Sequence, residues 1–457
     1  MTVNVHFVGI GGIHMSALAH ILLDDGLIVS GCDRADTPIL QPLRERGARI
    51  NIGHRPTHVT TATRVIRTVA VPPDHPEIAA ATELGIPCQT RAELLAEIAS
   101  SRDVIAVGGS HGKTTTTALI AHAMRASGRD TGYVLGGEAS DFEIHARRGS
   151  DPWLVLEADE YARAFHHYSP KVAVLNNAES DHLDYYGSEA ALSEAFLQYT
   201  RTLREGGALV VGVDSESAAE IAERLAHERP DVRIYSFASD RDADYRIHED
   251  GRDRFGQRYL LETPSATLLS YLDIPGLYNL RNAAAALAAT EIAGFDLATS
   301  AAAIADFRGV QRRFQVIGEH GGVVVLDDYA HHPTEVRAAL SAARACYPDR
   351  RLVVLFQPHT YTRTQYLLEE FRTCFTDADQ LYIADTYAAR EDQDRGLSAA
   401  QLAPQISSPS AIYAGSVADT AVAAAAASQP NDLIITMGAG DIAAAPAAVL
   451  RHLRGQR

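Results

Sequence analysis

The sequence has few residues of several kinds, and each shortage excludes a class of protein. Only four cysteines occur in 457 residues, with no CxxC pair, which argues against a disulfide framework or a zinc knuckle and fits a reducing compartment. No uncharged run approaches the ~18 apolar residues of a membrane span, and the N-terminal segment lacks the basic and apolar regions of a signal peptide. We therefore expect a cytoplasmic protein without a membrane partner.

Basic residues are also fewer than acidic ones. Forty-one Lys and Arg stand against 58 Asp and Glu, so the net charge is −17 and the global field repels polyanions such as nucleic acids. A phosphate-bearing ligand must then be held by groups placed at its own binding site and not by the overall charge of the protein. Hydrophobic residues at 46% and charged residues at 22% are ordinary globular proportions, and the length predicts two or three domains.

The first segment of the chain predicts a strand, a tight glycine turn and a helix. An apolar run over residues 3–10 leads into the glycine-rich loop 9–12, and the apolar residues that follow recur at helical spacing. A second strand over residues 27–30 leads to Asp33. This layout is typical of a mononucleotide-binding βαβ unit, although the dinucleotide pattern G-x-G-x-x-G needs a glycine where His14 stands.

A second segment opens in the same way but carries a cation. The apolar strand 104–107 is followed by GGSHGKTTTT and a helical pattern. Backbone N–H groups of residues 109–112 can surround phosphate oxygens, Lys113 can reach a terminal phosphate, and Thr114 can hold Mg²⁺. The loop is one residue shorter than the common phosphate-loop pattern, which has a glycine where Val107 stands.

Acidic side chains follow two later strands of this segment. The strand in WLVLEADE delivers Glu157, which we predict as a Mg²⁺ ligand, together with Asp159 and Glu160; Glu160 is expected to cap the next helix. The strand in KVAVLNNAESDH ends near His182, which is either a metal or phosphate ligand or a structural residue.

Polar side chains at a helix start and at two strand ends are further candidates for ligand contacts. Asn279 and Asn282 lie three apart at the start of a predicted helix, where they either read a purine edge or cap the helix. In the third segment, DDYAHHP brings acids, a tyrosine and two imidazoles to a strand end, with Pro333 suited to the first turn of a helix. Arg363, at the end of another strand, can clamp a carboxylate.

Other functions remain open on these residues alone. A nicotinamide-dependent oxidoreductase could use the first glycine loop, but it leaves the phosphate loop without a role. A nucleotide-binding sensor could use the second loop, but it leaves the acids, the Tyr329 and His331 cluster and Arg363 without one. A phosphate loop with acids in one segment and an anion-receiving edge in the next favours two ligands brought face to face.

Taken together, the motifs identify the chain as similar to the Mur ligases of bacterial peptidoglycan synthesis. The resemblance rests, in chain order, on GIGGIHMS, GGSHGKTTTT, EADE, NNAESDH, YNLRNAAAA, RRF, DDYAHHPTEV, FQPHTYTRT and GAGDI. It implies an α/β fold of three domains: an N-terminal Rossmann-like domain for the UDP-sugar (residues 1–101), a central P-loop ATPase with a mostly parallel sheet (102–312), and a C-terminal Rossmann-like domain for the amino acid (313–457).

The resemblance also implies the reaction. ATP, with Mg²⁺, would phosphorylate the lactyl carboxylate of UDP-N-acetylmuramate, and the amino group of L-alanine would attack the acyl phosphate. The alternative within the family is the recycling reaction, which attaches the tripeptide L-Ala-γ-D-Glu-meso-diaminopimelate. FQPHTYTRT favours the alanine-adding type, whereas EADEYARAF and NNAESDH favour the recycling type. We expect a monomer or a homodimer.

The residue roles that the resemblance implies fall into five groups. Catalytic roles go to Lys113, His111, Glu157, His182, Arg313 and His331, and metal binding to Thr114, Glu157 and His182. ATP binding goes to Gly109, Ser110, His111, Gly112, Lys113, Thr114, Thr115, Asn279, Asn282, Arg313 and Asp328. UDP-sugar binding goes to Gly11, Gly12, Met15, Ser16 and Asp33, and amino-acid binding to Tyr329, His331 and Arg363.

Overall fold

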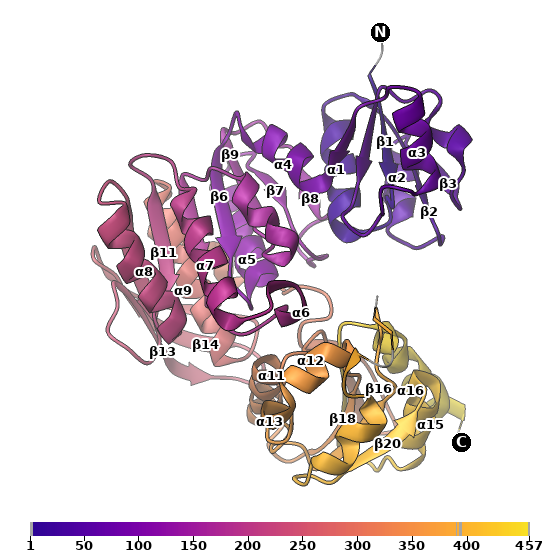
Figure 1. The fold of residues 1–457 in the computed structure, drawn as a ribbon. Coiled ribbons are helices and arrows are strands. Elements are labelled where there is room, and N and C mark those ends of the chain that lie inside the picture. Colours follow the sequence, from indigo (N-terminus) through magenta and orange to yellow (C-terminus); the bar gives the residue numbers. More distant parts are fainter. Residues whose placement is uncertain (1–2, 390, 393–394, 456–457) are drawn as a thin grey trace.

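The chain folds around three separate β-sheets, each the centre of one domain. The computed structural model describes residues 3–389, 391–392 and 395–455. Figure 1 shows the first domain in indigo and the third in orange to yellow, both beside the magenta middle domain. The α/β fold of three domains that the sequence predicts is confirmed.

The first domain has a five-stranded, fully parallel sheet in the order β3-β2-β1-β4-β5. This is the strand order of a Rossmann-type sheet without its sixth strand. Its elements are β1 (Asn4–Val8), α1 (Ile13–Asp24), β2 (Ile28–Asp33), α2 (Leu40–Glu45), β3 (Arg49–Ile52), the 3₁₀ turn η1 (Pro56–Val59), β4 (Arg64–Arg67), α3 (Pro76–Glu83), β5 (Cys88–Thr90) and α4 (Arg91–Ala99).

The middle domain has a ten-stranded sheet in the order β15-β14-β13-β12-β11-β10-β6-β9-β7-β8, parallel from β13 to β7 and antiparallel at both edges. Its elements are β6 (Asp103–Gly108), α5 (Lys113–Ala126), β7 (Gly132–Val134), β8 (Ala146–Arg147), β9 (Trp153–Glu157), η2 (Tyr161–His167), β10 (Val172–Leu175), α6 (Leu183–Tyr186), α7 (Glu189–Arg201), β11 (Ala208–Gly212), α8 (Glu216–Glu228), β12 (Arg233–Ala238), β13 (Tyr245–Arg252), β14 (Gln257–Glu262), β15 (Thr267–Leu272), α9 (Leu277–Ile292) and α10 (Leu297–Ala305).

The third domain has a six-stranded sheet in the order β16-β17-β21-β18-β19-β20, in which only β16 runs antiparallel. Its elements are β16 (Gln315–His320), β17 (Val323–Asp328), α11 (Pro333–Cys346), β18 (Arg351–Phe356), α12 (Tyr361–Tyr366), α13 (Leu368–Phe371), β19 (Gln380–Ala384), α14 (Ala399–Leu402), η4 (Ala403–Gln405), β20 (Ala411–Gly415), α15 (Val417–Ala426), β21 (Asp432–Met437), η5 (Asp441–Ala444) and α16 (Ala445–Gly455).

Local sequence signals explain where several of these elements begin. The Thr90 hydroxyl accepts the backbone N–H of Glu93 while the Glu93 carboxylate accepts that of Thr90, so a capping box starts α4. Pro333 occupies the first turn of α11, as predicted. The apolar strands β6, β9 and β10 are buried along almost their whole length because helices cover the parallel sheet on both faces.

The first two domains share a continuous apolar core. Helix α1 packs on β8, and the buried cluster that includes Val5 and Leu18 continues to Leu154 and Leu156 of the middle sheet. The arrangement fixes the loop after β1 relative to the loop after β6. Among the described residues, no helix combines the length and the apolar character needed to cross a bilayer.

Candidate functional site

The second glycine loop, between β6 and α5, makes a tight turn into the helix. Gly112 has a φ of +80°, and a Cβ at this position would collide with the side chain of Asn282. The backbone N–H of His111 donates to Asn177 Oδ1 at 2.8 Å. The turn is therefore held by side chains from two other elements, and glycine is required at its most crowded point.

Lys113, the first residue of α5, folds back over this loop. Its Nζ lies 2.7 Å from the carbonyl oxygen of Gly109, 3.1 Å from that of Ser110 and 2.8 Å from Glu160 Oε2. Burial lowers the pKa of Lys113, but the Glu160 and Glu157 carboxylates outweigh it and raise that pKa above its usual range. The ammonium group is thus charged and positioned at the loop. The expectation that Glu160 caps a helix is wrong, because its carboxylate pairs with Lys113 instead.

The two predicted oxygen ligands for Mg²⁺ lie side by side. Thr114 Oγ1 donates to Glu157 Oε2 at 2.8 Å, and the same oxygen accepts the backbone N–H of Gly136 at 3.1 Å. Burial raises the pKa of Glu157, although Lys113 partly offsets this. A cation bound here would compensate the buried carboxylate.

His182, the third predicted metal ligand, lies in a neighbouring group of side chains and not with Thr114 and Glu157. Its backbone has a φ of +51°, and its Nε2 lies 3.6 Å from Glu160 Oε1 and 3.9 Å from Asp181 Oδ2. The ligand atoms of these three residues lie within 4.8 Å of one another. The group has the composition of a second cation site beside Lys113.

His111 connects the middle domain to the third domain. Its Nε2 lies 3.5 Å from Glu179 Oε2, and its Nδ1 lies 3.4 Å from Glu335 Oε1 on α11. Burial lowers the pKa of His111, but the Glu179 and Glu335 carboxylates outweigh it and raise that pKa to about 10. The ring is therefore a cation at neutral pH. Sequence reasoning missed Glu335, because its capping box uses His332 in place of the usual serine or threonine.

A cavity of about 160 Å³ lies beside this loop, among residues predicted to bind ATP. Gly112, Thr114, Thr115, His111, Asn282, Arg313 and Asp328 line it. Four residues predicted to bind ATP are not among its lining residues: Gly109, Ser110, Lys113 and Asn279. The Asn279 amide donates to the carbonyl of Pro275 at 2.7 Å and accepts from Asn282 at 3.2 Å. Neither amide caps α9, whose N-cap is Gly276.

Asp328 lies at the end of β17 on the wall of this cavity. Its carboxylate accepts the backbone N–H groups of Phe314 and Ala330, both at 2.7 Å. Burial nevertheless raises the pKa of Asp328 to about 6, although Arg313 lowers it in part. The carboxylate holds the start of the third domain against the cavity.

The predicted amino-acid residues Tyr329, His331 and Arg363 all lie on one larger cleft of about 690 Å³. Arg363 donates from Nε and Nη2 to Asp181 Oδ1, at 3.0 and 2.6 Å, and so crosses from the third domain to the middle one. Burial lowers the pKa of His331 to about 4, although Glu335 opposes the shift, so its ring is neutral near pH 7. The part of the cleft that the third domain forms therefore combines a cation, a neutral imidazole and an aromatic ring.

The first glycine loop opens onto the same cleft. The backbone N–H of Gly11 donates to Asp33 Oδ2 at 2.8 Å, so Asp33 already holds this turn. The side chains of Met15 and Ser16 point inward: Met15 is part of the apolar core, and the Ser16 hydroxyl lies 2.9 Å from His145 Nε2. A contact from these two residues to a diphosphate would have to come from their backbone.

The cleft therefore gathers the predicted groups of all three domains. Its lining includes Gly11 and His14 of the first domain, Lys113, Thr114, Glu157 and His182 of the middle domain, and Arg313, Tyr329, His331 and Arg363 of the third. Parallel strands place their carboxyl ends at one edge of a sheet, which is why residues so distant in sequence meet here. One site can hold two or more ligands in contact.

Comparison with protein-family models agrees with this arrangement. Residues 4–103 match the Mur ligase family catalytic domain, residues 107–290 match the Mur ligase middle domain, and residues 312–440 match the Mur ligase glutamate ligase domain. Together the three models cover most of the chain in the order of the three sheets.

Similar proteins extend over nearly the full length. The chain is 41% identical to the UDP-N-acetylmuramate–L-alanine ligase of Roseiflexus castenholzii, covering 96% of this chain and 95% of the relative. It is 40% identical to the ligase of the same name from Acidothermus cellulolyticus, covering 99% and 95%.

Solved structures give the same result. The UDP-N-acetylmuramate-alanine ligase of Thermotoga maritima superposes with a TM-score of 0.84 at 27% identity, covering 99% of this chain and 100% of that one. A murein peptide ligase from Psychrobacter arcticus gives 0.76 at 27% identity, covering 99% and 98%. The family models, the relatives and the site geometry agree, and the chain belongs to the Mur ligase family.

Proposed function

We propose that this protein is an ATP-dependent ligase that joins L-alanine to the lactyl carboxylate of UDP-N-acetylmuramate in peptidoglycan precursor synthesis. The observation that carries the proposal is the single cleft shared by the Gly11 loop, the Lys113 loop and the Arg363 edge. Relatives that are 37–41% identical over nearly the whole chain bear the name of this ligase.

Each domain receives one substrate in this proposal. The first domain, residues 1–101, binds the UDP-sugar at Gly11, Gly12 and Asp33. The middle domain, residues 102–312, binds ATP on the loop 109–112. The third domain, residues 313–457, binds the amino acid at Tyr329, His331 and Arg363, all on the shared cleft.

Mg²⁺ fits the residues at the second loop. The Thr114 hydroxyl and the Glu157 carboxylate are oxygen donors in contact, and the burial that raises the pKa of Glu157 leaves a carboxylate for a cation to compensate. His182, with Glu160 and Asp181, forms the second candidate group. When bound, Mg²⁺ would neutralise charge on the phosphate oxygens of ATP.

The chain's own residues act on the phosphoryl group by position and charge. The lactyl carboxylate attacks the terminal phosphorus of ATP and ADP leaves. Lys113 and protonated His111 lie where negative charge develops on that group, and burial strengthens their effect. Arg313 lines both cavities and is the third cation at this point.

The second step needs an amine held beside the acyl phosphate. The amino group of L-alanine attacks the acyl carbon, phosphate leaves, and an amide forms. Arg363 can hold the carboxylate of L-alanine, with Tyr329 and neutral His331 beside it. The contact between Arg363 and Asp181 keeps the third domain against the middle one at this point.

The test is release of ADP and phosphate by the purified protein. Release should require UDP-N-acetylmuramate, Mg²⁺ and an amino acid together, and L-alanine should be a better substrate than glycine, L-serine or the tripeptide. Preference for the tripeptide would assign the recycling reaction. ATP binding without turnover of any UDP-muramyl substrate would favour a sensor, and NAD(P)H binding that UDP-sugars do not displace would favour an oxidoreductase.

The proposal places the enzyme in the cytoplasm, as a monomer or a homodimer, with small-molecule substrates only. Its net charge of −17 opposes binding to nucleic acids. The two nucleotide ligands are instead held by the N-termini of α1 and α5 and a few buried cations at the cleft.

A further inference from the structure

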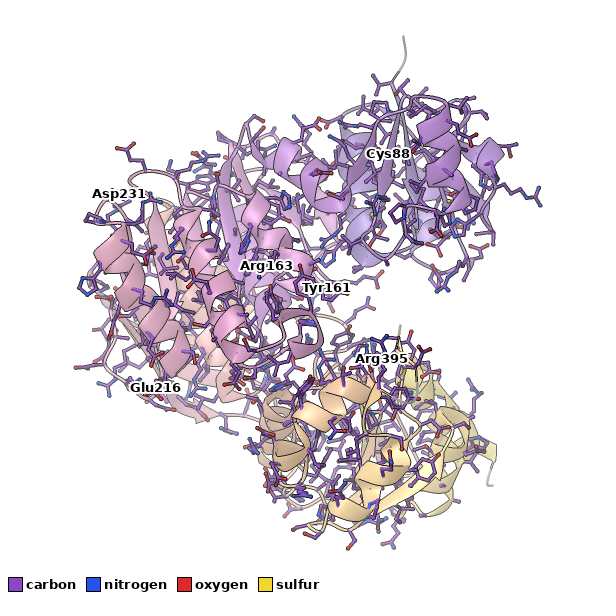
Figure 2. All side chains as sticks on the ribbon, viewed as in Figure 1. Cys88, Tyr161, Arg163, Glu216, Asp231 and Arg395 are labelled. Carbon is purple, nitrogen blue, oxygen red and sulfur yellow. The ribbon has the colours of Figure 1, made fainter. Side chains whose placement is uncertain are left out.

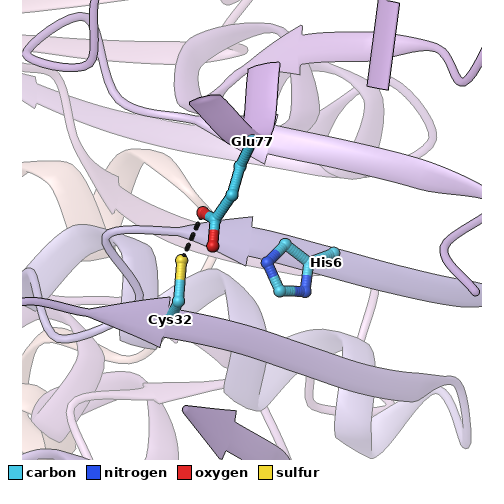
Figure 3. A group of neighbouring side chains, drawn as sticks. All are labelled: His6, Cys32 and Glu77. Carbon is cyan, nitrogen blue, oxygen red and sulfur yellow. Dashed lines mark hydrogen bonds between the residues drawn. The ribbon is translucent and has the colours of Figure 1, made fainter. Parts of the chain in front are cut away.

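The first domain contains a second cluster of chemically active side chains, separate from the cleft residues. Cys32 lies near the end of β2, His6 in the middle of β1 and Glu77 in the first turn of α3, and all three are fully buried. Figure 3 shows them converging between the sheet and this helix. The proposed reaction uses none of them.

Three ligand atoms in this cluster are already in mutual contact. Cys32 Sγ lies 2.6 Å from Glu77 Oε2 and 3.1 Å from His54 Nδ1, and His54 Nδ1 lies 3.4 Å from Glu77 Oε2. His54 follows β3 and is half-buried. A sulfur, a nitrogen and an oxygen from three elements thus surround one point.

His6 supplies an unsatisfied nitrogen at the same place. Its Nδ1 lies 3.0 Å from Ser30 Oγ, whereas its buried Nε2 has no hydrogen-bond partner among the described residues. The ligand atoms of His6, Cys32 and Glu77 lie within 4.8 Å of one another. An unpaired buried nitrogen calls for a partner.

Surrounding groups orient the carboxylate. His58 Nδ1 lies 2.7 Å from Glu77 Oε1, and the same oxygen accepts the backbone N–H of Arg55 at 3.1 Å. The ring of His75 packs edge-on against that of His54, with centroids 4.6 Å apart. Partners of this kind hold metal ligands in place, and the half-exposed His54 leaves a route from solvent.

We propose that Cys32, His54, Glu77 and His6 form a binding site for a divalent transition metal of the Zn²⁺ class. Thiolate, imidazole and carboxylate in a four-ligand set match the preferences of this class and not those of Mg²⁺. On binding, the sulfur–metal bond replaces the S–H bond, and the thiol proton that now faces Glu77 passes to solvent.

A metal at this site would stabilise the conformation of the first glycine loop without taking part in the reaction. Cys32 immediately precedes Asp33, whose carboxylate holds the backbone N–H of Gly11. A metal that joins β1, β2, the segment after β3 and α3 would fix the end of β2. This inference does not depend on the proposed function.

Cobalt is the probe of choice because a cobalt–thiolate bond absorbs in the near ultraviolet. The full-length, metal-free protein is titrated with Co²⁺ in the absence of nucleotides. The wild-type chain should develop thiolate-to-cobalt absorption that saturates at one equivalent, and Zn²⁺ should abolish it. Absence of this absorption in the wild-type protein would overturn the proposal whatever the variants do.

Two isosteric variants and a matched control assign the ligands. Cys32→Ser should lose the charge-transfer band, and Glu77→Gln should weaken Co²⁺ binding by at least about tenfold. Cys88→Ser removes the exposed cysteine of the same domain, labelled in Figure 2, and should leave the band unchanged. Zn²⁺ should raise the melting temperature of wild type and Cys88→Ser by more than that of Cys32→Ser or Glu77→Gln. A band that survives Cys32→Ser, or that Cys88→Ser removes, would refute the assignment.

Discussion

The two glycine loops of this protein have the same local architecture and different side-chain chemistry. Each follows a buried parallel strand and leads into a helix whose N-cap is a glycine, Gly12 in α1 and Gly112 in α5. The first helical residue is Ile13 in one and Lys113 in the other. The first loop is held by Asp33 of its own domain, and the second is surrounded by Glu157, Glu160 and groups from the third domain.

The difference shows that a strand, a turn and a helix suffice to form an anion site, while the surrounding side chains determine whether that anion is only bound or also reacts. Backbone N–H groups and a helix N-terminus suit a diphosphate that is only held. Transfer of a phosphoryl group needs cations and acids around the same backbone. The second loop has both, and the first has neither a lysine nor an arginine at the start of its helix.

The largest contrast is expected at the first helical position. Lys113→Ala should lower turnover by at least about 10²–10³-fold, because it removes the cation at the transferred group. Ile13→Ala, the matched change in the first loop, should lower it far less, because it removes an apolar contact and no charge at the transferred group. Steady-state ADP release measures both, and equal losses would show that the two loops do not differ in role.

The next contrast concerns affinity. Asp33→Ala should weaken binding of UDP-N-acetylmuramate by about 10–100-fold, because the first loop loses a charged hydrogen-bond partner at Gly11. Its affinity for ATP should stay unchanged. Lys113→Ala should produce the opposite pattern. Calorimetric titration of each ligand separates the effects, and a variant that weakens both ligands equally would mean that the loops are not independent sites.

A smaller contrast involves two arginines that hold acids of the middle domain. Arg363 contacts Asp181 through two nitrogens, whereas Arg91 of the first domain contacts Asp159 through Nη2 at 3.0 Å. Arg363→Lys should lower kcat/KM for L-alanine by about tenfold, because lysine cannot reproduce the planar fork. Arg91→Lys should change it by less than about threefold. KM for ATP serves as the internal control for both variants.

The smallest effect separates two histidines beside the loops. Two carboxylates raise the pKa of His111 to about 10, and burial lowers that of His14 to about 3. The stability from His111 is complete below pH 6.5 and is lost as pH rises through about 10, whereas His14 destabilises the fold as pH falls below 6.5.

The melting temperature should therefore fall between pH 7 and 10 in the wild-type protein, as the stability contributed by protonated His111 is lost. His111→Gln should flatten this alkaline limb, and His14→Gln should flatten the acidic one. A variant with the wild-type profile would contradict the assigned direction for its histidine.

Local patterns were sufficient to predict much of the fold. The strand before each glycine loop and the place of Pro333 in the first turn of α11 depend on neighbouring residues, so the sequence shows them directly. Thr114 and Glu157 were predictable because parallel strands present their ends at one edge.

Contacts between distant elements could not be predicted in the same way. Glu160 turns from its helix to Lys113, and Glu335 reaches across a domain boundary to His111, and neither partner is near in sequence. Met15 and Ser16 face inward because the packing of α1 on β8 decides which helix face is buried. The Cys32 cluster has no spacing motif, since its four members come from four separate segments.

The most direct test follows the phosphoryl group itself. UDP-N-acetylmuramate with a heavy oxygen isotope in both lactyl carboxylate positions is incubated with ATP, Mg²⁺ and L-alanine, and the products are analysed by mass spectrometry. An acyl-phosphate intermediate predicts one heavy oxygen in the released phosphate and one in the new amide. Unlabelled phosphate beside a doubly labelled, unreacted sugar would contradict the proposed ligase.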